Sequence, residues 1–367
     1  MKILFDHDVF TYQEIGGIAR CFSELIGQME KRVPGSCRMG FKFTNTLYLY
    51  ELGLAERFGL CHYPFGNHLW AKQLFFRINR FLFHQAVRRN DFDLLHLTFY
   101  PAPEIREMTA KPIAVTVHDM TPEIYPELFP DAGKWIAAKK FWCHHADLIF
   151  TDSAHTKMDL LRIFPDIPPE KVHRVYISGG FTSELNAELE VPESYLLYVG
   201  GRQNYKNFLP MLSALIPVFH EYENLHLICA GGGIFTEKEK EVIRNAGLTE
   251  RIIQKNLNEA ALAQLYKQAA ALIYPSLYEG FGIPILEAFS CGLPVLLSDR
   301  SCFPEIAGNA ALYFDPENAG SIEGAVRRIL AEPELRQELV RRGDLRLKDF
   351  SWEKSALELM EIYRQYI

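Results

Sequence analysis

Short apolar runs alternate with longer segments of helical periodicity along most of this chain. In the first half, four such runs are KILFDHD, DLLHLTFY, PIAVTVHDM and DLIFTDS, and helical patterns such as GGIARCFSELIGQME separate most of them. Short apolar runs with polar ends predict buried strands, and apolar residues three and four positions apart predict helices. The alternation therefore predicts a parallel sheet with helices on both faces.

The alternation stops near residues 178–194, where the segment SGGFTSELNAELEVPES is polar and has no period. It resumes with the runs YLLYVGG, LHLICAGGG, RIIQKNL, ALIYPS and PVLLSD. Between them, helices are expected from about 208, at about 236–247, at about 259–269 and from about 284. We therefore expect two doubly wound α/β units, with a hinge near residues 180–192 and a cleft between them. In such sheets, ligands bind beyond the carboxyl ends of the strands.

One such strand end begins the segment PSLYEGFGIPILEAFSCGLPV, residues 275–295. It carries two carboxylates, Glu279 and Glu287, and Pro284 suits the first position of the helix that follows. Glycines beside Glu279 leave backbone amides open to an anion at a helix start, and a carboxylate can accept both hydroxyls of a ribose. Ligand binding is the favoured interpretation; the alternative is that both glutamates only favour the helix dipole.

Three further candidates also lie at strand ends. In YVGGRQNYKNF, Arg202 and Lys206 suit a diphosphate, unless they are simply solvated loop cations. In EIGGIAR, Gly16 and Gly17 let the backbone approach a phosphate or sugar, although paired glycines usually only form a turn. In TVHDMTP, His118 is placed to bond a substrate hydroxyl, and a bond to local backbone is an equal alternative.

Composition narrows the classes of function. The 367 residues suffice for two domains, 48 % of them are apolar, and the net charge of −7 disfavours a general nucleic-acid binder. The seven cysteines form no CxxC pair, which predicts free thiols in a reducing cytosol. The chain start does not resemble a signal peptide, and no apolar stretch reaches the roughly 18 residues of a spanning helix. The acids of DFD, residues 91–93, are expected to flank a strand rather than bind a metal.

The segment WAKQLFFRINRFLFHQAVRR, residues 70–89, contains five Lys and Arg residues and no acids. Apolar residues at helical spacing are Trp70, Leu74, Phe75, Ile78, Phe81, Leu82 and Ala86. Two interpretations are open. The first, slightly favoured, is a domain helix with this stripe in the core and its basic face in water. The second is an amphipathic helix that lies on an anionic membrane.

Together these motifs resemble the retaining glycosyltransferases of family 4, which have the GT-B fold of two Rossmann-like domains. The likeness covers nearly the whole chain and is most specific in EGFGIPILEAFSCGLPV, while GGI, HD, DSAHTKMDL and GGRQNYKN match in order. It implies an acceptor-binding domain of residues 1–185, completed by a terminal helix at 351–367 that crosses back to it. It also implies a nucleotide-sugar-binding domain of residues 186–350.

The resemblance assigns the phosphate and ribose contacts. Arg202 and Lys206 would hold the donor's diphosphate, and Glu287 would bind the ribose hydroxyls. Gly16 and Gly17 would bring backbone to the phosphate from the first domain. No metal or other cofactor is implied, because basic residues and a helix start carry the charge of the leaving group.

The resemblance also assigns the contacts to the donor sugar. Glu279 and the backbone of Gly280, Phe281 and Gly282 would bind its hydroxyls. His118 would contact the sugar near the reacting carbon. Neither Glu279 nor His118 is assigned as a nucleophile, because family members are usually proposed to retain configuration without a covalent intermediate.

The implied function is hexose transfer from a nucleotide-diphosphate sugar to a glycan or lipid-linked acceptor in surface polysaccharide or lipopolysaccharide assembly. GDP-mannose or a GDP-deoxyhexose is the favoured donor, and the acceptor region is expected at 45–66. The implied location is the cytoplasm, with peripheral contact at the inner membrane face through 70–89. The alternatives are a UDP-hexose-dependent transferase, a sugar-nucleotide epimerase of the same fold, and a non-catalytic protein that binds nucleotide sugars.

Overall fold

The computed structural model describes residues 1–63, 68–181 and 188–367. It divides into two compact units, the first formed by Met1–Ser178 with Ser351–Ile367 and the second by Gly179–Phe350. The first unit therefore ends at Ser178, a few residues before the predicted boundary at 185. Part of the predicted hinge and of the predicted acceptor region lies outside the described residues, at 182–187 and 64–66.

The first unit is built on a six-stranded sheet in the order β2-β1-β5-β6-β7-β8, and every neighbouring pair is parallel. Its strands are β1 (Ile3–Phe5), β2 (Cys37–Met39), β5 (Leu94–Leu97), β6 (Ile113–Val117), β7 (Leu148–Thr151) and β8 (Val172–Arg174). Most of these strands are buried along their whole length, as expected for a sheet covered on both faces. The strand order reverses between β1 and β5.

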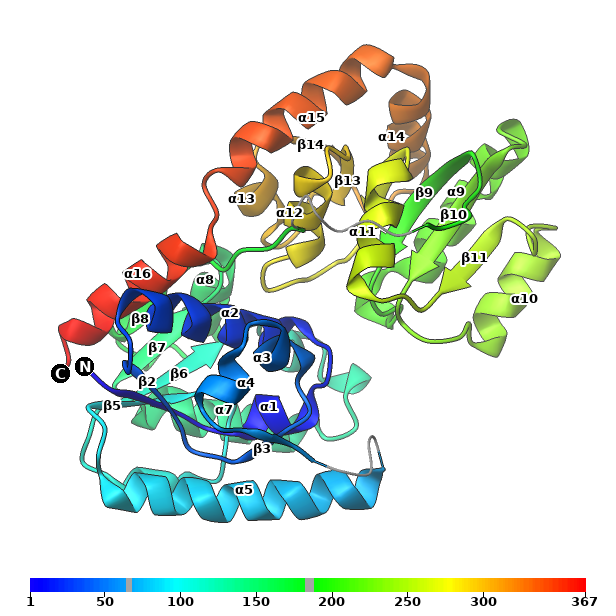
Figure 1. The fold of residues 1–367 in the computed structure, drawn as a ribbon. Helices are drawn as coiled ribbons and strands as arrows, with labels where there is room; N and C mark the ends of the chain where they lie inside the picture. The colour runs from blue at the N-terminus through cyan, green and yellow to red at the C-terminus, as the bar shows by residue number, and fades with distance from the viewer. Residues whose placement is uncertain (64–67, 182–187) are drawn as a thin grey trace. The chain divides into compact units, whose positions relative to one another are not determined.

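Helices surround this sheet (Figure 1). They are α1 (Asp8–Tyr12), α2 (Gly17–Arg32), α3 (Leu47–Glu51), α4 (Leu54–Arg57), α5 (Leu69–Arg89), α6 (Thr121–Ile124), α7 (Ala132–His145), α8 (Ala154–Ile163) and α16 (Trp352–Arg364). Short 3₁₀ turns are η1 (Pro103–Met108), η2 (Pro126–Leu128) and η3 (Pro169–Lys171), and a small parallel pair joins β3 (Phe43–Thr44) to β4 (Cys61–His62).

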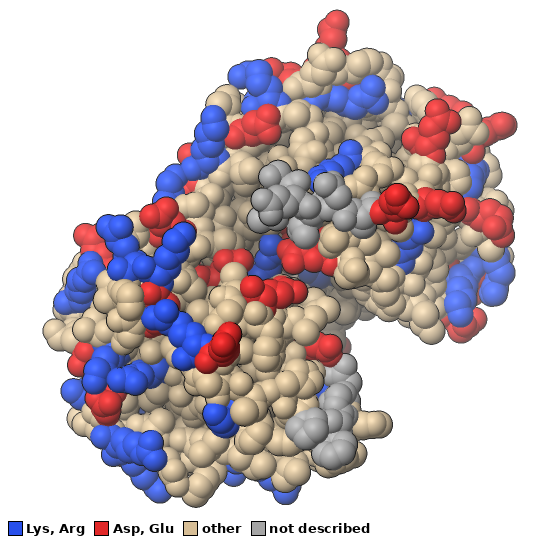
Figure 2. All heavy atoms as spheres, viewed as in Figure 1, with Lys and Arg blue, Asp and Glu red and all other residues tan. Residues whose placement is uncertain are grey.

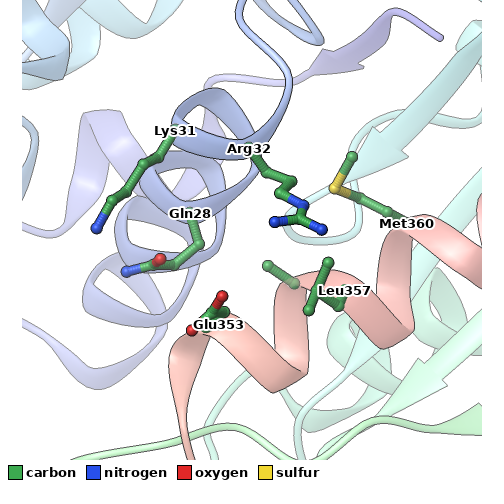
Figure 3. Close-up of a pocket in the computed structure, with 7 residues that line it drawn as sticks. Gln28, Lys31, Arg32, Glu353, Leu357 and Met360 are labelled. Carbon is green, nitrogen blue, oxygen red and sulfur yellow. The ribbon is translucent and has the colours of Figure 1, made fainter.

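The terminal helix α16 belongs to the first unit, which confirms the predicted return of the chain. It lies beside α2 in Figure 1 and packs against it. The Tyr363 ring is fully buried and its hydroxyl bonds Nδ1 of His96, whose Nε2 lies 2.8 Å from Oγ1 of Thr116. A pocket of about 190 Å³ remains between the helices, where Figure 3 shows Arg32 reaching toward Leu357 and Met360.

Helix α5 turns a different face to the core from the one that its hydropathy predicts. Its buried residues are Ala71, Phe75, Asn79, Phe83 and Val87, at intervals of four. The predicted stripe is wrong in part, because Trp70, Leu74 and Phe81 are 54 %, 46 % and 61 % exposed.

Asn79 explains this rotation, since its side chain serves as a buried polar link. It accepts a hydrogen bond from the Phe43 amide (3.0 Å) and donates to the Phe43 carbonyl (2.7 Å) and to Oγ1 of Thr11 (3.0 Å). A polar residue can occupy the core where its bonds are satisfied in this way. None of the described helices combines the length and apolar character needed to span a bilayer.

The second unit repeats the architecture, with a six-stranded parallel sheet in the order β11-β10-β9-β12-β13-β14. Its strands are β9 (Ser194–Val199), β10 (Leu225–Ala230), β11 (Ile252–Lys255), β12 (Ala271–Tyr274), β13 (Val295–Ser298) and β14 (Ala311–Phe314). The order reverses between β9 and β12. In a doubly wound sheet, the loops that follow the strands at this reversal border the ligand crevice.

The helices of the second unit confirm the expected positions. They are α9 (Phe208–Glu221), α10 (Glu237–Asn245), α11 (Glu259–Gln268), α12 (Ile283–Ser290), α13 (Phe303–Ala307), α14 (Ala319–Ala331) and α15 (Pro333–Leu347), with a 3₁₀ turn η4 (Asn204–Lys206). The core gathers apolar side chains of α9 and α14 against strands β9 and β10. This packing holds β9 and the rest of the sheet in place. The loops after β9 and β12 therefore start from fixed strand ends, where a ligand can bind.

Candidate active site

Two predicted site residues meet at the strand reversal of the second unit. Lys206 ends η4, which follows β9, and Glu279 lies in the loop after β12. Nζ of Lys206 is 2.6 Å from Oε1 of Glu279, and Oγ of Ser276 donates to the same oxygen at 2.7 Å. The side chains of Lys206 and Glu279 are 16 % and 12 % exposed. A cation and a carboxylate thus occupy the crevice edge side by side, still partly open to a ligand.

The Glu279 loop is held in place from two sides. Its amide donates to Oγ of Ser301 at 3.0 Å, and that hydroxyl donates back to the Glu279 carbonyl at 2.7 Å. Ser301 has a left-handed backbone, with φ of 57°. The neighbouring Phe281 ring is buried and packs edge-on to Phe350, with centroids 5.8 Å apart. These contacts fix the position of the Glu279 loop at the edge of the crevice.

The start of α12 differs slightly from the prediction. The helix begins at Ile283, so Pro284 is its second residue, and Gly282 occupies the capping position with φ of 95°. A Cβ on Gly282 would meet Cδ1 of Ile285 at 3.0 Å, so both conformation and space require glycine. Glu287 consequently lies in the second turn. Its carboxylate is almost buried, and Oε2 accepts a hydrogen bond from the Tyr266 hydroxyl at 2.8 Å.

Arg202 makes contacts that the sequence does not reveal. Its buried guanidinium pairs with Glu239, Nε to Oε1 at 2.9 Å, and lies 4.9 Å from the Phe235 ring. Its terminal nitrogens donate to the carbonyls of Gly231, Gly232, Gly233 and Ile234. The predicted diphosphate contact would require some of these bonds to be exchanged.

The glycine loop after β10 is shaped around this arginine. Gly231, Gly232 and Gly233 all have positive φ, at 82°, 71° and 73°. A Cβ on Gly232 would meet Nη1 of Arg202 and the Gly200 carbonyl, each at 2.7 Å. The glycines of the run AGGG therefore leave room for the Arg202 guanidinium. The sequence alone did not reveal this role.

In the first unit, His118 follows β6 and Asp152 follows the neighbouring strand β7. Nδ1 of His118 lies 2.7 Å from Oδ2 of Asp152, which is 5 % exposed. In this geometry the carboxylate favours the tautomer of the imidazole with a proton on Nδ1, which leaves the lone pair on Nε2. Nε2 has no hydrogen-bond partner among the described residues. Asp152 was missed as a site residue, because only the pairing of β6 with β7 brings it to His118.

Two family models match the chain in succession. "Glycosyltransferase Family 4" matches residues 15–177, and "Glycosyl transferases group 1" matches residues 184–346. The chain belongs to the family 4 glycosyltransferases. Its two parallel sheets, in which Lys206, Glu279 and His118 follow the carboxyl ends of strands, agree with that assignment.

Curated relatives of this glycosyltransferase include two bacterial mannosyltransferases. O-antigen chain mannosyltransferase B of Escherichia coli is 29 % identical over 266 residues, 68 % of this chain and 69 % of the relative. O-antigen chain mannosyltransferase RfbU of Salmonella typhimurium is 28 % identical over 244 residues, 66 % of each chain. The alignments thus span about two thirds of the relatives.

Solved structures with the same GT-B fold cover the chain more fully. Sucrose-phosphate synthase from Thermosynechococcus elongatus superposes with a TM-score of 0.72 at 19 % identity, covering 99 % of this chain and 98 % of that one. Anabaena HepE in complex with UDP-glucose gives a TM-score of 0.72 at 16 % identity, with full coverage of both chains. The fold predicted for this glycosyltransferase is therefore confirmed.

The predicted glycine pair of the glycosyltransferase opens α2. Gly17 is the first helical residue, and Gly16 before it is extended, with φ of 179°. A Cβ on Gly16 would meet Oε1 of Gln13 at 2.4 Å, and that oxygen accepts the Ala19 amide at 3.1 Å. The absent side chain of Gly16 therefore makes room for Gln13 to bond the start of the helix.

A buried acidic cluster follows β1, at the strand reversal of the first unit. Oδ1 of Asp6 accepts hydrogen bonds from the Thr98 amide (3.2 Å) and hydroxyl, while Oδ2 has no partner among the described residues. Burial raises the pKa of Asp6 to about 6. Burial, and then the charge of Asp6, raise the pKa of Asp8, and burial lowers the pKa of His7 to about 3. Sequence reasoning missed both carboxyls.

Within the described part of the chain, no three His, Cys, Asp or Glu side chains are grouped so as to hold a metal ion. All seven cysteines are free. The triplet at residues 91–93 serves the fold, because Asp93 accepts the Lys2 amide at 2.7 Å and Asp91 pairs with the Lys2 ammonium at 2.6 Å. These acids flank β5, as the sequence predicts.

Proposed function

We propose that this glycosyltransferase moves a hexose from a nucleotide-diphosphate sugar to a glycan or lipid-linked acceptor in surface polysaccharide assembly, with retention of configuration. GDP-mannose or a GDP-deoxyhexose is the proposed donor. The observation that carries the proposal is the Lys206–Glu279 pair at the strand reversal of the second unit. The names of the two O-antigen mannosyltransferase relatives support the choice of sugar and pathway.

In the proposed reaction, the oxygen of an acceptor hydroxyl bonds to the anomeric carbon of the donor. The bond from that carbon to the β-phosphate oxygen breaks, and its electron pair leaves with the nucleoside diphosphate. The hydroxyl proton passes to the departing phosphate oxygen. The ammonium of Lys206 favours the charge that grows on the diphosphate, and one such fixed group is typically worth about 10²–10³ in rate.

The remaining residues would position the donor. Glu279, relieved of Lys206 by the diphosphate, would accept hydroxyls of the sugar together with the loop backbone at Gly280. Glu287 would accept the ribose hydroxyls, with Oε2 held by Tyr266. From the first unit, Nε2 of His118 would accept a sugar hydroxyl, its ring fixed by Asp152. Because Lys206 and backbone amides supply the positive charge, we propose that turnover needs no metal and persists in EDTA.

The exposed face of α5 supports a peripheral contact with an anionic membrane. Trp70, Leu74 and Phe81 are exposed together with Arg77 and Arg88 on the same side of the helix. Figure 2 shows basic side chains among uncharged ones along its lower edge, where α5 runs. Exposed aromatic and aliphatic side chains enter the headgroup boundary while arginines meet anionic lipid. Such a contact would bring a cytoplasmic enzyme to a lipid-linked acceptor at the inner membrane face.

A ligand screen tests the donor. The melting temperature of the purified protein is measured with GDP-mannose, GDP-fucose, UDP-glucose and UDP-galactose, because a ligand that binds only the folded state raises it. Mass spectrometry then tests whether the stabilising donor adds a hexose to an oligosaccharide. We expect the GDP-sugars to stabilise most. A larger shift with a UDP-sugar would support a UDP-hexose-dependent transferase, and no shift with any donor would contradict the proposal.

An epimerase and a non-catalytic binding protein would each behave differently from a transferase. An epimerase would convert a nucleotide sugar into its epimer without an acceptor, which chromatography of the unreacted donor detects. A non-catalytic protein would show a thermal shift and no turnover. The intact Lys206–Glu279 pair and the nearby Glu287 favour transfer over both.

A further inference from the structure

A second pocket lies in the first unit, at the carboxyl ends of β5 and β6. Its volume is about 210 Å³, and its lining includes Phe99, Tyr100, His118, Asp119 and Trp135. Phe99 and Tyr100 follow β5, His118 and Asp119 follow β6, and Trp135 lies on α7. Ligands of parallel sheets bind at these strand ends, so the pocket stands where a substrate is expected.

Three aromatic rings make one wall of this pocket. The Phe99 ring lies 5.1 Å from the Trp135 ring in an edge-to-face arrangement and 4.9 Å from the Tyr100 ring. The indole of Trp135 is 44 % exposed, although the large aromatic side chains of this chain are mostly buried. A pyranose has an apolar face of C–H bonds that packs on such rings, whereas its hydroxyls need polar partners at the edge.

The polar groups that line the pocket are few. His118 and Asp119 lie at the strand end, and Oδ1 of Asp119 also accepts the Thr121 amide at 2.9 Å. The Lys139 ammonium in the lining forms an ion pair with Glu123 (2.7 Å) and donates a hydrogen bond to the backbone carbonyl of Asp119 (2.8 Å). A largely apolar lining with a carboxylate at the strand end suits the C–H face of a neutral sugar.

We propose that this pocket holds the terminal neutral pyranose of the acceptor, stacked on Trp135 and Phe99 with a hydroxyl directed to Asp119. The inference rests on the proposed function, because it names the residues that receive that enzyme's second substrate. The pocket lies outside residues 45–66, the acceptor region that the sequence predicts.

The test measures sugar binding and transfer separately. Saturation-transfer difference NMR records binding of the methyl α-glycosides of mannose, glucose, galactose and N-acetylglucosamine and of mannotriose. Steady-state assays measure transfer to mannotriose, and donor hydrolysis without acceptor reports the donor site. The variants are Trp135→Ala, Trp135→Phe, and Met158→Ala as a control that removes an even more exposed apolar side chain from α8.

We expect at least one pyranoside to bind the wild type through its C–H protons. Trp135→Ala should abolish that signal and raise the KM for mannotriose about tenfold or more, with donor hydrolysis unchanged. Trp135→Phe should restore part of the binding, and Met158→Ala should behave as wild type. Equal signals in wild type and Trp135→Ala, or no signal in the wild type, overturn the pocket assignment. A Trp135-dependent signal without turnover of any nucleotide sugar would instead refute the proposed function.

Discussion

Oδ2 of Asp152 lies 2.7 Å from Nδ1 of His118, so the ends of two neighbouring strands, β7 and β6, are joined by a hydrogen bond. The bond selects the imidazole tautomer that leaves the lone pair on Nε2. Asp152 is therefore a positioning residue for His118.

Asp152→Asn should lower kcat about 10- to 100-fold and leave the KM for the donor nearly unchanged. The amide can still bond the ring, but it no longer favours the Nδ1–H tautomer, and hydrogen bonds to charged groups are worth about 1.5–3 kcal/mol. Steady-state kinetics with the stabilising donor measure both constants. Asp166→Asn is the matched control, because its carboxylate pairs with His144 on the surface. A purely structural role would lower the melting temperature and leave kcat per folded molecule unaltered.

Arg202 should contribute to stability as well as to any ligand contact. Arg202→Ala breaks a buried pair with Glu239 and removes the hydrogen bonds that the guanidinium donates to four loop carbonyls. Removing one partner of a buried pair costs about 3–5 kcal/mol. Chemical denaturation should show this loss, whereas Arg300→Ala, which removes half-exposed pairs, should cost about 0–1 kcal/mol. If Arg202 only binds ligand, the ligand-free variant will unfold at the wild-type denaturant concentration.

Asp6 should make the protein respond to pH. Its folded pKa, raised to about 6, means that the folded state takes up a proton before the unfolded chain does. Its contribution to stability is present below about pH 4 and is lost as pH rises through about 6. Buried His7 and His96, whose pKa values are lowered to about 3, act in the opposite sense and destabilise the fold as pH falls below about 6.5.

Asp6→Asn should therefore steepen the loss of stability on acidification. Asparagine keeps an acceptor for Thr98 and removes the carboxyl whose protonation offsets the histidines. Melting temperatures measured from pH 7 to 4.5 should fall further in the variant than in the wild type. Parallel profiles would show that the Asp6 carboxyl has an ordinary pKa in the folded protein.

The exposed face of α5 should bind anionic vesicles. Arg77, Arg88 and Arg89 replaced together by Ser should reduce flotation with phosphatidylglycerol liposomes about 100-fold in partition constant, since each basic residue is worth about 1 kcal/mol at such a surface. Changing Lys238, Arg244 and Lys348 to Ser removes the same charge elsewhere and is the control. Equal flotation of the two triple variants would dismiss this face as the membrane contact.

The elements of the fold could be predicted because their signals are local. Most strands of the two sheets are apolar runs, whereas β2 and β8, which contain Arg38 and Arg174, were not predicted. The helix starts expected near 208, 259 and 284 fall within a residue or so of Phe208, Glu259 and Ile283. The face of α5 could not be predicted, because Asn79 enters the core through bonds to residues that are distant in sequence, at Thr11 and Phe43.

The site was predictable only in part for the same reason. Lys206 and Glu279 are 73 residues apart, and each was marked by its own strand end and by the family resemblance. The partners of predicted residues carry no such mark. Glu239 caps a helix and also holds Arg202, and Asp152 resembles any acid after a strand until the order of β6 and β7 is known.

The central claim is that the Lys206–Glu279 site binds the diphosphate of a nucleotide sugar and promotes its departure. The most direct measurement is the rate of nucleoside diphosphate release from GDP-mannose and UDP-glucose, with and without mannotriose, by the wild type and by Lys206→Ala. The control is Lys240→Ala, which loses only an exposed pair with Glu237. We predict release by the wild type and by the control, and a rate about 10²–10³-fold lower in Lys206→Ala. Equal rates in Lys206→Ala and wild type, or no release by the wild type from either donor, would contradict the claim.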